Sequence, residues 1–338
     1  MSVLHDTARD LVVPAKGILA ADESTGTIKK RFDSIGVEST EEQRRRYRQL
    51  LFTTPGVGDH ISGVILFDET IRQSADDGRT FVDVLRAAGV VPGIKVDTGA
   101  KPLAGFPDET VTEGLDGLRE RLTEYAELGA RFAKWRSTIV IGDGTPTDFA
   151  ILANAHGMAR YAALCQEAGI VPIVEPEILM DGDHDLAACA SATARTLDAL
   201  YEQLAAHRVD LPGSLLKVNM VVPGKGNAVQ DDDGAIAKAT IETLTAHVPA
   251  EVPGVVFLSG GMTDEQATNR LNEMNKVGGF PWELSFSYGR ALQAPSLNAW
   301  KGEEANVEAA QAALAHRAKM NGLARSGAYA PEMESSAA

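Results

Sequence analysis

The sequence predicts an α/β fold, in which eight parallel strands alternate with helices and close into a single (β/α)8 TIM barrel. Short, nearly continuous apolar runs recur along the chain, as expected for strands that are covered on both faces. Charged, amphipathic stretches separate these runs, and no linker of biased composition divides the 338 residues. We also expect extra helical segments at the N-terminal and C-terminal ends. An open, doubly wound sheet is the alternative fold.

The eight apolar runs are the expected strands, at residues 17–22, 61–67, 92–97, 131–136, 170–177, 215–221, 255–260 and 283–289. Helix starts are indicated between them by side chains that can accept hydrogen bonds from free backbone N–H groups, or by a proline that fits the first turn. These starts lie at Ser39, Thr110, Thr145, Asp185 and Thr263. The segment that starts at Thr110 is expected to be helical as far as Leu128, and a last helix is expected over residues 303–319.

The domain organisation follows from this alternation and from the composition of the C-terminal end. We expect residues 1–320 to form the barrel as one catalytic domain. Residues 321–338 are rich in Ala, Ser and Gly, which favours a flexible tail.

The charge balance excludes several classes of partner. Lys and Arg total 32, Asp and Glu total 47, and the formal net charge is −15 at pH 7. A body this acidic does not attract nucleic acid or an anionic membrane through its overall field. Aromatic residues make up only 6% of the chain, which also argues against a surface for stacking bases. Any phosphate-bearing ligand must therefore be held by a local cluster of cations.

The cysteines and the terminal segments indicate a cytoplasmic protein without a metal. Cys165 and Cys189 form no C-x-x-C pair and no cluster with histidines, so we expect two reduced thiols and no metal site. The N-terminus has no basic segment followed by an apolar run, and no stretch approaches the roughly 18 apolar residues of a membrane span.

Charged and polar side chains occur inside the expected strands, close to their carboxyl ends. Since alternate residues of a barrel strand point inward, residues two apart share a face. Four such pairs are present: Lys95 with Asp97, Lys134 with Arg136, Glu175 with Glu177, and Lys217 with Asn219. One strand lysine by itself is usually solvated, but four pairs at matching strand ends are too costly to be ordinary core residues. They predict a functional cleft at the end of the barrel that carries active sites.

Two segments have the features of phosphate-binding loops. The first is Ser259, Gly260 and Gly261 after the seventh strand, together with Arg290 after the eighth, where such barrels commonly bind phosphate. The second is the segment 22–27 at the end of the first strand, with Lys30 and Arg31 following. Ordinary glycine turns and a helix N-cap are the alternative interpretations, although a free helix N-terminus can cap and bind an anion at once.

Taken together, the motifs resemble those of class I fructose-1,6-bisphosphate aldolases. The matching segments are AADESTGT (20–27), FAKWR (132–136), IVEPEIL (173–179), DGDHD (181–185), LLKVNM (215–220), LSGG (258–261) and FSYGRAL (286–292). They occur in order over most of the chain. The resemblance implies the same barrel and the reversible cleavage of fructose 1,6-bisphosphate into dihydroxyacetone phosphate and glyceraldehyde 3-phosphate, in glycolysis and gluconeogenesis. It also implies a homotetramer, no metal and no other cofactor.

The resemblance assigns a role to each residue of the predicted site. Lys217 matches the Schiff-base lysine and Glu175 the general acid/base, while Lys134 is its cationic neighbour. Glu177 matches a carboxylate beside the nucleophile, and Asp22 the residue at the hydroxyl that loses its proton. One phosphate site is matched by Ser259, Gly260, Arg290 and Arg31, and the binders at the other end of the substrate by Ser24, Thr27, Lys95 and Arg136.

Elementary electrostatics agrees with these roles. A free lysine has a pKa of about 10.4 and must lose its proton before it can attack a carbonyl. A second ammonium about 5 Å away, at an effective dielectric of about 20, favours that loss by roughly 3 kcal/mol. Lys134 is placed to supply most of this effect, and desolvation in the barrel mouth the rest. Two alternatives stay open: another Schiff-base aldolase or transaldolase acting on a sugar monophosphate, and a non-catalytic phosphosugar-binding or scaffolding protein.

Overall fold

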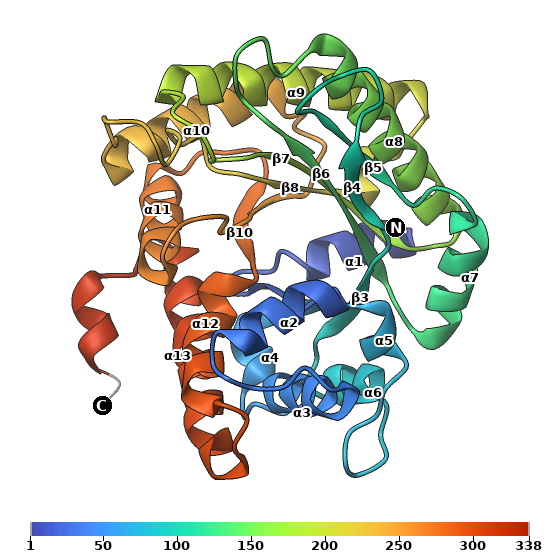
Figure 1. The fold of residues 1–338 in the computed structure, drawn as a ribbon, viewed down its shortest axis with the longest axis vertical. Coiled ribbons are helices and arrows are strands. Elements are labelled where there is room, and N and C mark those ends of the chain that lie inside the picture. Colours follow the sequence, from blue (N-terminus) through green and yellow to red (C-terminus); the bar gives the residue numbers. More distant parts are fainter. Residues whose placement is uncertain (1, 337–338) are drawn as a thin grey trace.

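Eight parallel strands close into a barrel in the computed structural model, which describes residues 2–336 (Figure 1). Around the barrel the strand order is β1-β10-β9-β8-β7-β6-β3-β2. The strands are β1 (Gly17–Ala20), β2 (Ile61–Leu66), β3 (Val91–Lys95), β6 (Phe132–Ile139), β7 (Val171–Ile178), β8 (Leu215–Val218), β9 (Gly254–Phe257) and β10 (Glu283–Tyr288). Each overlaps one of the predicted apolar runs, with ends that differ by up to three residues, so the predicted fold class is confirmed and the open sheet is not formed.

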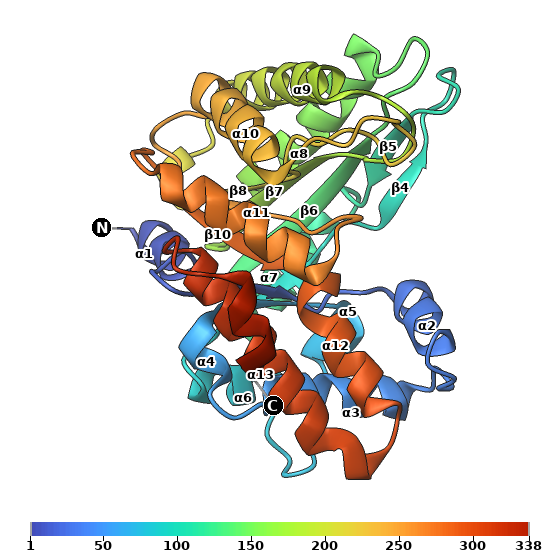
Figure 2. The same cartoon turned by 90° about the vertical axis from the view of Figure 1, so that its left-hand side faces the viewer.

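Helices surround the barrel and extend the fold at both ends, as predicted. The helices before β6 are α1 (Val3–Asp10), α2 (Thr25–Asp33), α3 (Glu41–Phe52), α4 (Val57–His60), α5 (Asp68–Ile71), α6 (Phe81–Ala87) and α7 (Leu118–Leu128). Those after it are α8 (Asp148–Glu167), α9 (Leu186–Ala206), α10 (Asp233–His247), α11 (Asp264–Val277), α12 (Arg290–Trp300) and α13 (Val307–Ala324). Short 3₁₀ helices lie at Leu211–Gly213, Glu304–Asn306 and Pro331–Ser336. Helix α1 precedes the first strand, and α13 packs beside α11 and α12 (Figure 2).

The helix predicted to start at Thr110 is wrong in its first part. Residues Thr110–Glu113 form β5, which pairs antiparallel with β4 (Gly99–Pro102). Tertiary contacts explain the difference, because the N–H of Thr112 donates to Asn154 Oδ1 and its hydroxyl donates to the carbonyl oxygen of Arg136. The helix itself, α7, begins at Leu118 after Gly117, whose positive φ of 63° ends the preceding turn.

Two of the other predicted helix starts, Thr263 and Asp185, are confirmed by their caps. The starts predicted at Ser39 and Thr145 are displaced, because Thr40 caps α3 and Thr147 caps α8. The hydroxyl of Thr263 accepts the N–H of Gln266, whose side chain accepts the N–H of Thr263 in return, so the capping box is complete. Asp185 accepts the N–H of Ala188 at the start of α9. The last helix begins four residues later than predicted and ends at Ala324, so the predicted division at residue 320 falls inside α13.

An apolar layer fills the closed end of the barrel, directly below the charged residues. Phe132 is fully buried there with Ile173 and Leu215, and each lies two residues before a charged residue of the same strand. A Cβ atom at Gly93 would lie 2.4 Å from the Phe132 ring, so the close approach of β3 to this ring requires glycine. Because the lower layer excludes water, the charges above it can be reached from the open end of the barrel only.

Substitution by alanine should have opposite effects on stability at two glycines, because Gly93 contacts the apolar layer and Gly157 does not. Gly93→Ala forces the Phe132 ring to move and should lower the free energy of unfolding by about 1–3 kcal/mol. Gly157→Ala, in the middle of α8 with open space around it, should raise it by about 0.5–1 kcal/mol through helix propensity. Urea unfolding followed by circular dichroism measures both, and equal effects would contradict the described packing.

Candidate active site

A cavity of about 230 Å³ opens at the carboxyl ends of the barrel strands. Every residue of the predicted site except Gly261 lines it: Asp22, Ser24, Thr27, Arg31, Lys95, Lys134, Arg136, Glu175, Glu177, Lys217, Ser259, Gly260 and Arg290. Segments up to 268 residues apart in sequence therefore meet at one end of the barrel. Their meeting follows from the period of two along each strand, which points alternate side chains inward.

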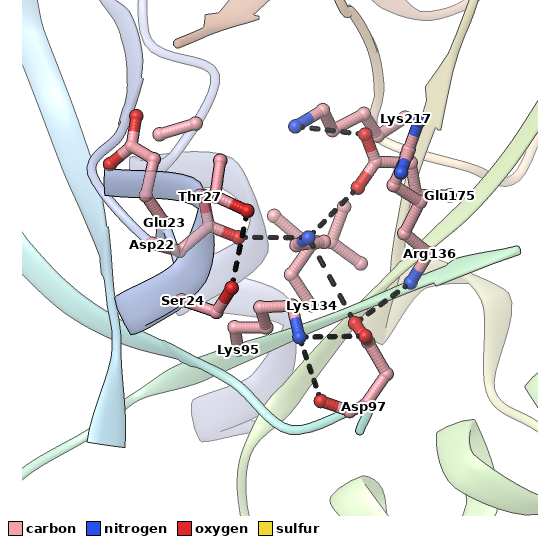
Figure 3. Close-up of polar contacts among 12 residues, drawn as sticks. Asp22, Glu23, Ser24, Thr27, Lys95, Asp97, Lys134, Arg136, Glu175 and Lys217 are labelled. Carbon is pink, nitrogen blue, oxygen red and sulfur yellow. Dashed lines mark hydrogen bonds and ion pairs between the residues drawn. The ribbon is translucent and has the colours of Figure 1, made fainter. Parts of the chain in front are cut away.

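Lys134 lies at the centre of the charged side chains in this cavity (Figure 3). Its Nζ atom is 2.8 Å from Asp22 Oδ2, 3.3 Å from Glu175 Oε2 and 4.0 Å from Asp97 Oδ2, and its side chain is only 4% exposed. Burial by itself lowers the pKa of Lys134, but the three carboxylates outweigh it and hold that pKa above its ordinary value. Lys134 is therefore a permanent cation.

The same contacts keep two neighbouring carboxyls ionised. Burial raises the pKa of Asp22, but the ammoniums of Lys134 and Lys217 outweigh burial and hold that pKa well below its usual range. Burial likewise raises the pKa of Glu175, and Lys134, Lys217 and Arg136 outweigh it, so this pKa is also lowered. Both groups are carboxylates at neutral pH, able to accept a proton from a bound substrate.

The amine of Lys217, on β8, contacts the Glu175 oxygen that does not face Lys134. Its Nζ atom is 3.0 Å from Glu175 Oε1, so Glu175 lies between the ammoniums of Lys217 and Lys134 (Figure 3). The carboxylate thus offsets part of the repulsion between the two amines, a compensation that the pattern of strand residues does not predict. A carboxylate in contact with a buried amine is placed to exchange protons with it.

One side of the cavity carries two hydroxyls and two cations. Ser24 Oγ and Thr27 Oγ1 are 3.1 Å apart at the start of α2. Lys95 Nζ lies 2.7 Å from Asp97 Oδ1, and Arg136 is hydrogen-bonded through Nε to Glu177. All four side chains line the cavity, and they carry N–H and O–H donors of the kind that an oxyanion of a ligand requires.

The other side is built from the loops after β9 and β10. Ser259 and Gly260 follow β9, and Arg290 is the first residue of α12, whose free backbone N–H groups favour an anion. Gly261 lies behind this wall with a φ of +74°, and a Cβ atom there would be 2.0 Å from Met180 Sδ. Gly261 therefore determines the shape of the loop, and its neighbours Ser259 and Gly260 line the cavity.

Sequence reasoning missed several residues of the cavity. Ser287, on the inward face of β10, lines it with a buried hydroxyl that has no hydrogen-bond partner within the described chain. Alternation along the strand is the signal that identifies it. Asp97 was paired with Lys95 on one strand face, and the structure adds its contact with Lys134. Glu23 also lines the cavity, next to Asp22 in sequence.

The family model of class-I fructose-bisphosphate aldolases, described as glycolytic, matches residues 3–338. The chain belongs to this family. It is 56% identical to the cytosolic fructose-bisphosphate aldolase 4 of Arabidopsis thaliana, over 94% of this chain and 81% of the relative. It is 53% identical to fructose-bisphosphate aldolase 2 of Caenorhabditis elegans, over 99% of this chain and 92% of the relative. The predicted family and the predicted class of carbon–carbon lyase are thus confirmed.

A solved structure of the family has the same fold. Fructose-bisphosphate aldolase from Plasmodium falciparum, in a ternary complex with TRAP and a small-molecule inhibitor, superposes with a TM-score of 0.96. The two chains are 49% identical, and the match covers 97% of this chain and 95% of the other. Among residues 2–336, no helix is long and apolar enough to cross a membrane, and no group of three His, Cys, Asp or Glu side chains is arranged to hold a metal ion.

The charge network predicts a pH-dependent cost for removing its central cation. Carboxyls with lowered pKa stabilise the native state above their unfolded pKa, and this contribution is lost as pH falls through the lowered value. In Lys134→Met, Asp22 and Glu175 lose that cation and their pKa rises, so the variant loses more stability as pH rises. The loss should reach about 3–5 kcal/mol at pH 8 and be smaller at pH 5.

Urea unfolding at both pH values measures this difference. Lys29→Met is the matched control, because Lys29 pairs with Asp33 on the exposed surface of α2. Its loss should stay below about 0.5 kcal/mol at either pH. The same loss for Lys134→Met at pH 5 and pH 8 would contradict the coupling between Lys134 and the two carboxyls.

Proposed function

We propose that this chain reversibly cleaves fructose 1,6-bisphosphate into dihydroxyacetone phosphate and glyceraldehyde 3-phosphate through a Schiff base on Lys217. The observation that carries the proposal is the position of the Lys217 amine, buried in the barrel mouth 3.0 Å from Glu175. Membership of the class-I family supports it, and so does the set of cations around the cavity. The proposed reaction uses no metal and no other cofactor.

The proposed mechanism uses Glu175 for the proton transfers of Schiff-base formation and Asp22 for the proton of the C4 hydroxyl. The neutral amine of Lys217 adds to the substrate's C2 carbonyl, and Glu175 carries protons as the carbinolamine loses water to give an iminium ion. Asp22 then accepts the proton of the C4 hydroxyl. The C3–C4 bond breaks, glyceraldehyde 3-phosphate leaves, and the electron pair moves into the iminium to form an enamine. Protonation at C3 and hydrolysis release dihydroxyacetone phosphate and the free amine.

Lys134 supports these steps without changing its own charge. Its contacts hold Asp22 and Glu175 in the ionised form that can accept protons. Glu177 lines the same cavity, and its carboxylate is hydrogen-bonded to Arg136. We assign Glu177 to the proton transfers beside the nucleophile and Lys134 to the electrostatic balance of the site.

Two groups of donors fit the two phosphates of the substrate. Each phosphate carries about −1.5 to −2 charges, against a net charge of −15 on the chain. We assign one phosphate to Ser259, Gly260, Arg290 and Arg31, and the other to Ser24, Thr27, Lys95 and Arg136. The presence of donors on both sides of the cavity favours a bisphosphate over a sugar monophosphate.

We further propose that the protein acts in the cytoplasm as a homotetramer, with a single catalytic domain that extends beyond residue 320, because α13 continues to Ala324. The support for the first two points is family membership, and one relative is named cytosolic. The proposed partner is the sugar phosphate itself, with no nucleic acid and no membrane, in keeping with the net charge of −15.

Reductive trapping tests the Schiff base. Sodium borohydride added together with dihydroxyacetone phosphate should inactivate the enzyme and leave a covalent adduct on the peptide that contains Lys217, detected by mass spectrometry. Lys217→Met should form no adduct and lack cleavage activity, and EDTA should leave the activity of the unmodified chain unchanged. An adduct on another lysine, or loss of activity with EDTA, would overturn the proposed mechanism.

A comparison of substrates tests the second phosphate site. Lys95→Met should lower kcat/KM for fructose 1,6-bisphosphate by roughly 10- to 100-fold, since a charge-assisted contact is lost. The value for fructose 1-phosphate, which lacks the second phosphate, should change much less. Lys101→Met is the control, because this lysine is exposed on β4 outside the cavity. Equal losses with both substrates would show that Lys95 does not bind the second phosphate.

A further inference from the structure

The carboxylate of Glu23 is buried in the part of the cavity wall that we assign to one phosphate of the substrate. The side chain of Glu23 is 4% exposed, lies in the loop between β1 and α2, and points away from the Lys134 network (Figure 3). It forms an ion pair with Arg31, one of the arginines assigned to phosphate. A carboxylate here acts against phosphate binding in two ways, because it repels the dianion and neutralises the arginine that should attract it.

A second arginine shares this carboxylate from behind the wall. Arg48 comes from α3, and its Nη2 atom is 2.8 Å from Glu23 Oε2. Its side chain is 3% exposed, and its Nη1 atom is buried without a hydrogen-bond partner in the described chain. Arg48 therefore does not reach the cavity, and it is not among the residues that line it. Burial of an arginine with an unused donor costs free energy. This cost suggests that the charge of Arg48 has a role.

The position of Glu23 is fixed by further contacts. Gln293 Nε2, on α12, donates to Glu23 Oε1 at 2.9 Å and to the carbonyl oxygen of Ala20 at 2.6 Å. The hydroxyl of Tyr47 donates to Gln293 Oε1 at 3.2 Å, and the Arg48 guanidinium lies 5.8 Å from the centre of the Tyr47 ring. Contacts from Arg48 on α3 and Gln293 on α12 thus hold the carboxylate, and Gln293 is itself held by the Ala20 carbonyl of β1.

The net charge of the cluster formed by Glu23, Arg31 and Arg48 determines how strongly this wall attracts a phosphate. Glu23 with Arg31 alone is neutral, whereas Glu23 with both arginines carries one positive charge. The extra charge lies behind the wall, where water is excluded and screening is weak. Arg48 provides the Glu23 carboxylate with an ion pair inside the protein. The guanidinium of Arg31 can therefore exchange its contact with Glu23 for a contact with phosphate.

We propose that Arg48 is a positioning residue for phosphate binding, which neutralises Glu23 and so leaves Arg31 available to the phosphate group of the substrate. The inference rests on the proposed function, because it takes Arg31 as a phosphate ligand. It adds a residue of α3, outside the cavity, to the determinants of substrate affinity.

The test measures KM and kcat for fructose 1,6-bisphosphate and the inhibition constant of inorganic phosphate. Arg48→Met should raise KM and the inhibition constant roughly tenfold and change kcat far less, because a charge near the phosphate is lost. Arg48→Lys keeps the charge and should restore most of the affinity. Arg46→Met is the matched control on α3, where Arg46 pairs with the exposed Glu304 and should affect neither constant.

The double variant distinguishes a charge effect from a structural one. Combining Arg48→Met with Glu23→Gln leaves Arg31 as the one charge of the cluster, the same net charge as in the unmodified chain, so affinity should return to within about twofold. Glu23→Gln alone should bind inorganic phosphate more tightly, and this variant tests the idea even where Arg48→Met does not fold. A double variant as weak as Arg48→Met, or weaker phosphate binding by Glu23→Gln, would overturn the inference.

Arg31→Met separates this inference from the proposed phosphate site. If Arg31→Met raises both constants while Arg48→Met leaves them unchanged, the phosphate site stands and the role of Arg48 is wrong. If Arg31→Met has no effect, Arg31 is not a phosphate ligand and the assigned phosphate site itself fails.

Discussion

Mutual compensation of buried charges is the constraint on which the site depends. Lys134 contacts Asp22, Asp97 and Glu175 in a place that water scarcely reaches, and Glu175 in turn contacts Lys217. An unpaired charge there would be neutralised or expelled. Lys134 keeps Asp22 and Glu175 ionised, and these carboxylates in turn keep Lys134 charged. The proposed chemistry uses this state directly, since it needs ionised carboxylates beside an amine that can give up its proton.

The closed barrel provides the surroundings in which such compensation works. Along three adjacent strands an apolar residue is followed two positions later by a charged one: Phe132 by Lys134, Ile173 by Glu175, and Leu215 by Lys217. The apolar layer closes the barrel from below, and the period of two along each strand directs the charged layer to the open end. The architecture and the electrostatics of the site are therefore two consequences of one alternating pattern.

The same pattern explains what the sequence can and cannot predict. Strands, and the charged residues at their ends, follow from local periodicity, so the barrel and nearly all of the cavity wall are predictable. The strand that begins at Thr110 is not predictable in this way, because its sequence resembles a helix cap. Hydrogen bonds with Asn154 and with the carbonyl oxygen of Arg136 hold it in the extended conformation instead. The pairing of Glu23 with Arg48 joins segments that lie on no common strand face, and Gly261 supports a loop whose shape depends on Met180.

A structure of the chain with fructose 1,6-bisphosphate, trapped at neutral pH, tests the central claim most directly. The account predicts continuous electron density between Lys217 Nζ and C2 of the sugar, with Glu175 beside the new bond and Lys134 still in contact with Asp22. A sugar bound with C2 out of reach of Lys217, or joined to a different lysine, would contradict it.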